Sequence, residues 1–194
     1  MKATTSVLAA LATGMVCSSV LAALQPGSPA PQFTATASRN GKSFQYSLKS
    51  ALRRGPVVVY FYPSAYTRGC DIEAHTFSTQ IAKFKAAGAS VVGVSLDSIA
   101  RLNDFSKDPD FCAGNFPVAS DPDGHIAQSY ELMVSPGHEG AQDVRGQVIG
   151  HGFAERTTFI IARNGTIAAT VGGVAPADNV AKALSAVQDL SAHK

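Results

Sequence analysis

The chain has 194 residues, of which 45% are hydrophobic and 15% are charged. This length and composition fit one globular α/β domain with a substantial hydrophobic core. The formal net charge of +2, with no run of lysine or arginine, argues against a nucleic-acid-binding protein. Small molecules and other proteins are therefore the expected partners.

Residues 1–23 have the features of a cleavable export signal. Lys2 supplies the positive start, residues 6–20 are almost all small or apolar, and small residues that suit signal peptidase lie at the end. The apolar run is shorter than the roughly 20 residues that a membrane span needs, so a cleaved signal is favoured over an N-terminal anchor. We expect export to the bacterial periplasm of one domain, residues 24–194, with no membrane attachment.

The sequence contains three cysteines. Cys17 lies within the predicted signal, in a sequence that makes a poor lipoprotein box, so the mature protein would retain Cys70 and Cys112. A pair of cysteines in an exported protein allows one intramolecular disulfide, and from composition alone a structural disulfide is the simpler interpretation. The sequence around Cys70 favours a chemical role instead.

The first elements after the signal are a hairpin, a short helix and a buried strand. Residues 32–46 alternate around Asn40-Gly41, a dipeptide typical of a tight β-hairpin turn. One or two helical turns are expected over residues 48–53. The continuous apolar run of residues 57–62 predicts a central strand that is buried on both faces.

A long helix and a second strand follow. From Asp71 the apolar residues recur with helical spacing, starting with Ile72 and Phe77. Gly88 is expected to close this helix. Residues 91–95 predict a second buried strand, so that strand, helix and strand would form a right-handed parallel unit.

The second half of the chain is expected to continue this alternation. Its glycine, histidine and polar content predicts a surface loop over residues 135–152. A second hairpin is expected around Asn164-Gly165. The other expected elements are a helix over 98–106, an extended segment at 116–118, a short helix over 124–131, strands at 157–161 and 166–170, and a closing helix over 179–190.

Cys70 lies where a strand and a loop lead into the first turn of a helix. The thiolate is the nucleophilic form, and an ordinary thiol with a pKa near ~8.5 is only about 3% ionised at neutral pH. Free backbone N–H groups and the positive end of the helix dipole stabilise an anion, and a nearby arginine would add to this. A pKa lowered by about two units, or roughly 2.7 kcal/mol, would leave the sulfur mostly ionised. This placement favours a nucleophile over a structural disulfide.

The segment of residues 57–70 resembles the active-site strand and loop of the peroxiredoxins, the AhpC/TSA family. Pro63, Thr67 and Cys70 match the Pro-x-x-x-Thr-x-x-Cys signature of that family, and residues 71–74 are most similar to the bacterioferritin comigratory protein, or PrxQ, subfamily. Further segments agree in order, at residues 27–33, 116–121 and 156–161 and at Asn164-Gly165. The resemblance spans nearly all of the mature chain. It implies a thioredoxin-like α/β fold, with a central mixed β-sheet flanked by helices and an N-terminal β-hairpin.

The resemblance also implies a role for each site residue. Cys70 would attack the terminal oxygen of a hydroperoxide and become a sulfenic acid. Thr67 would hydrogen-bond the thiolate and the substrate oxygen, and Arg156 would supply fixed positive charge. Pro63 would shape the pocket and shield the sulfur from water, and Glu73 would orient an arginine or a backbone donor.

Each of these assignments has a structural alternative. Pro63 could simply end a strand, Thr67 could cap the helix, and Arg156 could be a surface arginine. Arg68 is nearer to Cys70 in sequence, but it falls at a variable position of the family.

The second cysteine would complete the cycle. Many PrxQ proteins carry a resolving cysteine five residues after the first, where this chain has His75. Other members carry it on a later helix before a Phe-Pro segment, and Cys112 with Phe116-Pro117 resembles that arrangement, although a proline interrupts the helix. Bonded cysteines need Cα atoms within about 7 Å, so we expect the Cys70 turn and residues 109–115 to unfold locally in order to meet.

The resemblance implies an atypical two-cysteine peroxidase that reduces hydrogen peroxide and organic hydroperoxides. A dithiol protein of thioredoxin or glutaredoxin type would then reduce the Cys70–Cys112 disulfide. The subfamily favours a monomer. We expect no cofactor and no metal, since His125, His138 and His151 show no ligand spacing. The alternatives are a thioredoxin-like oxidoreductase acting on protein disulfides, which the lack of Cys-x-x-Cys disfavours, and a non-enzymatic exported domain with one structural disulfide.

Overall fold

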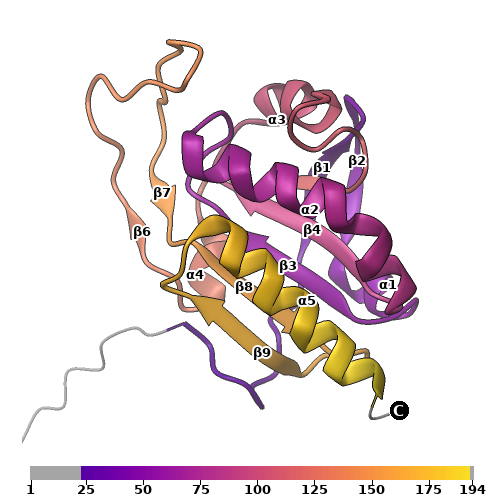
Figure 1. Cartoon of the computed structure of the whole chain (residues 1–194). Coiled ribbons are helices and arrows are strands. Elements are labelled where there is room, and N and C mark those ends of the chain that lie inside the picture. The colour runs from indigo at the N-terminus through magenta and orange to yellow at the C-terminus, as the bar shows by residue number, and fades with distance from the viewer. Residues whose placement is uncertain (1–22, 193–194) are drawn as a thin grey trace, which may run out of the picture.

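The computed structural model describes residues 23–192 of the chain (Figure 1). The export signal predicted for residues 1–23 therefore lies, except for Ala23, outside the described residues. In the described part of the chain, no helix is both long and apolar enough to cross a membrane.

A seven-stranded mixed sheet forms the centre of the fold, with the strand order β2-β1-β5-β4-β3-β8-β9. Its strands are β1 (Thr34–Arg39), β2 (Lys42–Ser47), β3 (Val57–Phe61), β4 (Ser90–Ser95), β5 (Val118–Ser120), β8 (Thr157–Ile161) and β9 (Ile167–Gly172). Strand β3 is parallel to β4 and antiparallel to β8. Because every residue of β3 is buried, the prediction of a central strand from the apolar run is confirmed.

Helices cover both faces of this sheet. They are α1 (Leu48–Leu52), α2 (Arg68–Ala86), α3 (Ile99–Lys107), α4 (His125–Ser129) and α5 (Pro176–Ala192). Alternate residues of β3 enter two hydrophobic clusters, since Val58 and Tyr60 pack with α2, α3 and α5, whereas Val59 and Phe61 pack with α1 and α4. Figure 1 shows α2 and α5 side by side across one face. The expected mixed sheet flanked by helices is confirmed.

Most local signals in the sequence act as expected. Asn40 and Gly41 have positive φ values of 50° and 74°, as the tight turn between β1 and β2 requires. Gly88, with a φ of 78°, follows the C-cap residue of α2 and ends that helix. Ile72 differs from expectation, because it is 46% exposed and lies outside the buried face of α2. That face consists of Cys70, Glu73, Ala74, Phe77, Ser78, Ile81 and Phe84.

The segment predicted as a surface loop contains more contacts than expected. Strands β6 (Val134–Ser135) and β7 (Phe153–Ala154) pair with each other and enclose residues 136–152. Within this excursion, Gln142 and Val148 form a β-bridge. Asp143, next to the bridge, is only 6% exposed. Most residues from 136 to 150 are exposed, as expected for a surface loop, and the excursion projects from the domain (Figure 1) with Asp143 and Ile149 as its buried residues.

Candidate active site

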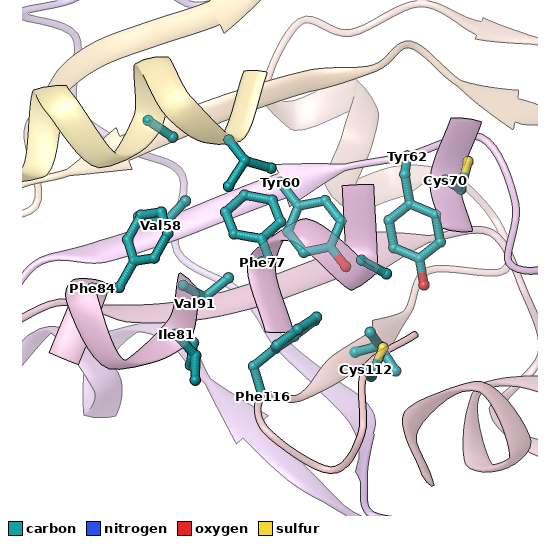
Figure 2. Packing of buried hydrophobic residues seen from close by; sticks show 14 of the residues in the cluster. Val58, Tyr60, Tyr62, Cys70, Phe77, Ile81, Phe84, Val91, Cys112 and Phe116 are labelled. Atoms are coloured by element: carbon teal, nitrogen blue, oxygen red, sulfur yellow. The ribbon is translucent and has the colours of Figure 1, made fainter. Parts of the chain in front are cut away.

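Cys70 lies in the first turn of α2, immediately after the loop that leaves β3. The helix begins at Arg68, and Thr67 is its N-cap residue with an extended backbone. Cys70 is 1% exposed and belongs to the hydrophobic cluster between the sheet and α2 (Figure 2). The predicted position at a helix start is confirmed, and the thiol is shielded from bulk water.

Arg156 brings a positive charge to Cys70 from a distant part of the chain. Its Nη2 lies 3.2 Å from Sγ of Cys70, and its Nη1 donates to the carboxylate of Glu73. Glu73 is fully buried, one turn after Cys70 on the same helix. This ion pair holds the guanidinium group against the sulfur. Arg68 is exposed, so Arg156 and not Arg68 supplies the charge.

Thr67 is next to the sulfur but directs its hydroxyl proton elsewhere. Its Oγ1 donates to the carbonyl oxygen of Ser64 at 2.8 Å. In the described part of the chain, the Thr67 side chain accepts no hydrogen bond from a backbone N–H of α2. The hydroxyl still acts to lower the pKa of Cys70. A hydroxyl has one proton to donate, so donation to the sulfur or to a bound oxygen requires Thr67 to release Ser64.

Pro63 and Arg156 share a small pocket at the surface. Its volume is about 220 Å³, and its other lining residues are Met133, Ser135, Phe153, Ala154 and Glu155. A larger pocket of about 650 Å³ is lined by residues such as Lys49 and Arg163 and by none of the residues around Cys70. The smaller pocket therefore contains two residues of the predicted site, and Cys70 lies buried outside its lining.

Burial has the largest effect on the Cys70 thiol and raises its pKa above the ordinary value. Arg156, Thr67 and the Ser64 backbone act in the opposite direction, but they do not overcome burial in the closed structure. The expectation that this site lowers the pKa is therefore wrong for the resting protein. Formation of the thiolate depends on the Arg156 contact, and its loss would raise the pKa further.

Burial and the Arg156 charge also act on the pKa of Glu73. Burial raises the pKa of Glu73 to about 7, while Arg156 opposes that rise. Oε1 of Glu73 has no hydrogen-bond partner among the described residues. Burial and the Arg156 contact thus act on the Glu73 carboxyl in opposite directions, and the charged form depends on its partner Arg156.

Gly69 is a site residue that sequence analysis missed. A Cβ atom at this position would lie 3.1 Å from Nη2 of Arg156 and 3.6 Å from Cγ of Pro176. The absence of a side chain thus lets Arg156 cross the start of α2 and reach the sulfur. The available signal was a glycine within a helix, where it costs about 1 kcal/mol relative to alanine.

A buried carboxylate behind the Cys70 loop was also missed. Asp97 accepts hydrogen bonds from Oγ of Ser64 at 2.9 Å and from N of Ala65 at 2.7 Å. Arg101 and His151 each lie 2.9 Å from the same carboxylate. Burial acts to raise the pKa of Asp97, but hydrogen bonds from His151 and Ala65 lower it overall. His151, expected only as a loop residue, therefore ties the 136–152 excursion to the Cys70 loop.

Cys112 is buried near Cys70 but is not bonded to it. Both cysteines in the described part of the chain are free. They belong to one cluster, and Tyr62 lies near both (Figure 2). As the sequence predicts, the helix before Cys112 stops short of Pro109: α3 ends at Lys107, and a residue that precedes proline disfavours helical geometry. Cys112 lies in the turn segment that follows.

Two side chains of α2 hold the segment that carries Cys112. Nδ1 of His75 lies 2.9 Å from the carbonyl oxygen of Asp110. Oγ of Ser78 donates to the carbonyl oxygen of Cys112 at 3.2 Å. The position that carries a cysteine in many PrxQ proteins thus contacts the Cys112 segment here.

Comparison with known proteins identifies the family of the chain. The sequence profile of the AhpC/TSA family matches residues 26–170. A Mycobacterium tuberculosis protein named as a peroxiredoxin is 34% identical over 160 residues, which cover 82% of this chain and 92% of the relative. Peroxiredoxin Bcp of Xanthomonas campestris is 32% identical over 111 residues, which cover 57% of this chain and 62% of the relative.

A solved structure supports the fold. The crystal structure of the peroxidoxin BcpB from Mycobacterium tuberculosis matches with a TM-score of 0.70 and 24% sequence identity, and the match covers 86% of this chain and 98% of that chain. The fold is thus thioredoxin-like. The chain belongs to the AhpC/TSA family, the peroxiredoxins, and is a thiol-dependent peroxidase.

Proposed function

We propose that the chain is an exported two-cysteine peroxidase of the bacterioferritin comigratory protein (PrxQ) type, with Cys70 as peroxidatic and Cys112 as resolving cysteine. Its substrates would be hydrogen peroxide and organic hydroperoxides. The observation that carries this proposal is the 3.2 Å approach of Nη2 of Arg156 to Sγ of Cys70. Since Cys70 is 1% exposed, a small hydroperoxide is favoured over a protein disulfide as its oxidant.

In the first step, the Cys70 thiolate attacks the terminal oxygen of the hydroperoxide. The O–O bond breaks, the sulfur becomes a sulfenic acid, and the other oxygen takes a proton and leaves as alcohol or water. Arg156 stabilises the negative charge while it moves from sulfur to the leaving oxygen. Thr67 can donate to the peroxide once it releases Ser64. Pro63 covers one side of the pocket.

In the second step, the Cys112 thiol attacks the sulfenic sulfur of Cys70, forms the disulfide and releases water. Both sulfurs are buried in the folded protein, so both segments must open first. Tyr66 and Ala113 have left-handed backbone, with φ values of 59° and 49°, and opening would relax both. An external thioredoxin-like or glutaredoxin-like dithiol protein then reduces the disulfide by exchange.

Location and assembly belong to the same proposal. Residues 1–23 would direct export to the bacterial periplasm, where residues 24–194 would act as a monomer. In that compartment the electron donor must be an exported dithiol protein. The cycle itself requires no cofactor, metal, nucleic acid or membrane.

Replacing Cys112 by serine should preserve the first oxidation of Cys70 and stop recycling. Without a resolving thiol, the sulfenic acid persists and excess peroxide converts it to the sulfinic acid. We expect steady-state turnover with a dithiol protein to fall at least about tenfold. Stopped-flow oxidation followed by intact mass measures both steps. Loss of the first oxidation itself would contradict the role assigned to Cys112.

Replacing Gly69 by alanine should slow Cys70 oxidation without destabilising the fold. The new methyl group would lie 3.1 Å from Nη2 of Arg156, closer than a normal contact, so the guanidinium group must shift from the position in which it contacts the sulfur at 3.2 Å. We expect a roughly tenfold slower oxidation, equivalent to about 1.4 kcal/mol, with an unchanged or higher Tm because alanine favours a helix. Gly150→Ala, at a position with no atom within 4 Å of the added carbon, is the control, and equal oxidation rates for both variants would refute the role of Gly69.

A further inference from the structure

Residues 141–149 of the β6–β7 excursion form a small turn, the 141–149 turn, that the peroxidase cycle described above does not use. N of Ile149 donates to the carbonyl oxygen of Ala141 at 2.8 Å, and Gln142 pairs with Val148. Inside the turn, Asp143 accepts hydrogen bonds from the backbone of Arg145 at 2.8 Å and of Gln147 at 2.9 Å. The turn is therefore built around one buried carboxylate.

The 141–149 turn contacts the Cys70 loop at Tyr66. N of Val144 donates to the carbonyl oxygen of Tyr66 at 2.9 Å. The guanidinium carbon of Arg145 lies 3.2 Å from the centre of the Tyr66 ring, a cation–π arrangement. The turn thus holds both the backbone and the side chain of a residue that lies four positions before Cys70 in the sequence.

Arg145 is itself fixed in place. Its Nε and Nη2 donate to Oδ2 of Asp143 at 3.1 and 3.0 Å. The same oxygen accepts a bond from Arg101 at 2.8 Å, and Arg101 donates to the carbonyl oxygen of Ala65 at 2.8 Å. One carboxylate therefore aligns two arginines on the adjacent residues Ala65 and Tyr66.

Tyr66 is a residue that needs such support. Its φ of 59° is a left-handed conformation that costs a non-glycine residue roughly 1–2 kcal/mol and persists only where the surroundings enforce it. Its ring also packs edge-on against Phe105 and Phe111, at centroid distances of 5.1 and 5.5 Å. Phe111 precedes Cys112, so Tyr66 joins the two segments that must separate before the disulfide can form.

We propose that Arg145 is a positioning residue that clamps Tyr66 and thereby keeps the Cys70 turn folded. The clamp sets the competition between two fates of the Cys70 sulfenic acid. In the folded pocket, a second hydroperoxide transfers one oxygen to the sulfur, giving the sulfinic acid and an alcohol or water. After opening, Cys112 forms the disulfide and releases water. This competition exists only if Cys112 resolves Cys70, as proposed above.

Replacing Arg145 by alanine should therefore favour the disulfide over the sulfinic acid, because the open state of the Cys70 turn gains population. We expect disulfide formation to become about five- to tenfold faster, which corresponds to the loss of one cation–π contact, and the peroxide concentration that gives half sulfinic acid to rise by a similar factor. Arg145→Lys should fall between alanine and the wild type, because lysine keeps a cation over the ring but loses the paired bonds to Asp143. Arg163→Ala is the control, since Arg163 contacts Arg53 and not the Cys70 loop.

The test combines stopped-flow kinetics and intact mass over a series of hydrogen peroxide concentrations with hydrogen exchange of the reduced proteins. Exchange at residues 64–72 should be about tenfold faster in Arg145→Ala than in wild type. Unchanged exchange there would overturn the clamp whether or not Cys112 resolves Cys70. A wild-type protein that is oxidised at Cys70 but forms no disulfide with Cys112 would instead refute the proposed resolving step. An unchanged disulfide-to-sulfinic ratio in Arg145→Ala, with a normal wild-type disulfide, would also overturn the clamp.

Discussion

Replacing Cys70 by serine should reduce peroxide consumption to the background rate of the dithiol reductant alone. A serine hydroxyl is not ionised near neutral pH, so the Arg156 contact at 3.2 Å from the native sulfur would have no anion to stabilise. Coupled turnover with a thioredoxin-like protein, measured with hydrogen peroxide and with an organic hydroperoxide, checks the result. Cys70 is buried among apolar neighbours, and serine is of similar size, so the variant should fold.

The matched control for Cys70→Ser is Cys112→Ser, which removes the other buried thiol of the described chain. With equimolar hydroperoxide, Cys112→Ser should consume one hydroperoxide per molecule, whereas Cys70→Ser should consume none. Equal single-turnover consumption by the two variants would show that Cys70 is not the nucleophile.

Replacing Arg156 by methionine should slow the oxidation of Cys70 by about 100- to 1,000-fold, the usual effect of removing one donor that stabilises transition-state charge. Arg156 also acts to lower the pKa of Cys70 against the effect of burial. Without it the pKa rises further, so a smaller fraction of the sulfur is thiolate at any pH below that pKa. The pH–rate profile should therefore move to higher pH. The difference in oxidation rate between Arg156→Met and the wild type should become smaller as pH rises.

Loss of Arg156 leaves Glu73 buried without its partner, and breaking a buried ion pair typically costs about 3–5 kcal/mol of folding free energy. Arg156→Met combined with Glu73→Gln removes that unpaired carboxyl and should recover stability but not the oxidation rate. Arg156→Lys keeps the charge without the paired geometry and should recover part of the rate. Recovery of the rate by the double variant would show that Arg156 has only a structural role.

Local patterns predicted most of the fold. The apolar run of β3, the Asn40-Gly41 turn and the Gly88 helix end are each decided by a few adjacent residues, and the structure confirms them. The helix start at Cys70 follows in the same way, because a strand, a loop and an amphipathic segment succeed one another directly. Family resemblance then singled out Arg156, which the helix start alone does not reveal.

The misses concern contacts between residues far apart in sequence. Gly69 matters only because Arg156, 87 positions later in the sequence, crosses it. His151 and Asp143 lie in a segment that the sequence predicts as a polar loop. Nothing in the neighbouring residues shows that they pair with Asp97, which follows β4, and with Arg101 on α3. The net effect on the Cys70 pKa depends on burial by the whole domain, whereas the sequence showed only the helix start and a charge.

The most direct test of the central claim is to trap the first oxidised species. Cys112→Ser protein, mixed with equimolar hydroperoxide and a cyclic dione that reacts with sulfenic acids, is digested and mapped by mass spectrometry. The geometry around Cys70, with Arg156 at 3.2 Å and the sulfur buried, predicts a single dione adduct on the peptide that contains Cys70. An unmodified Cys70 with the hydroperoxide unconsumed, or an adduct on a different residue, would contradict the account.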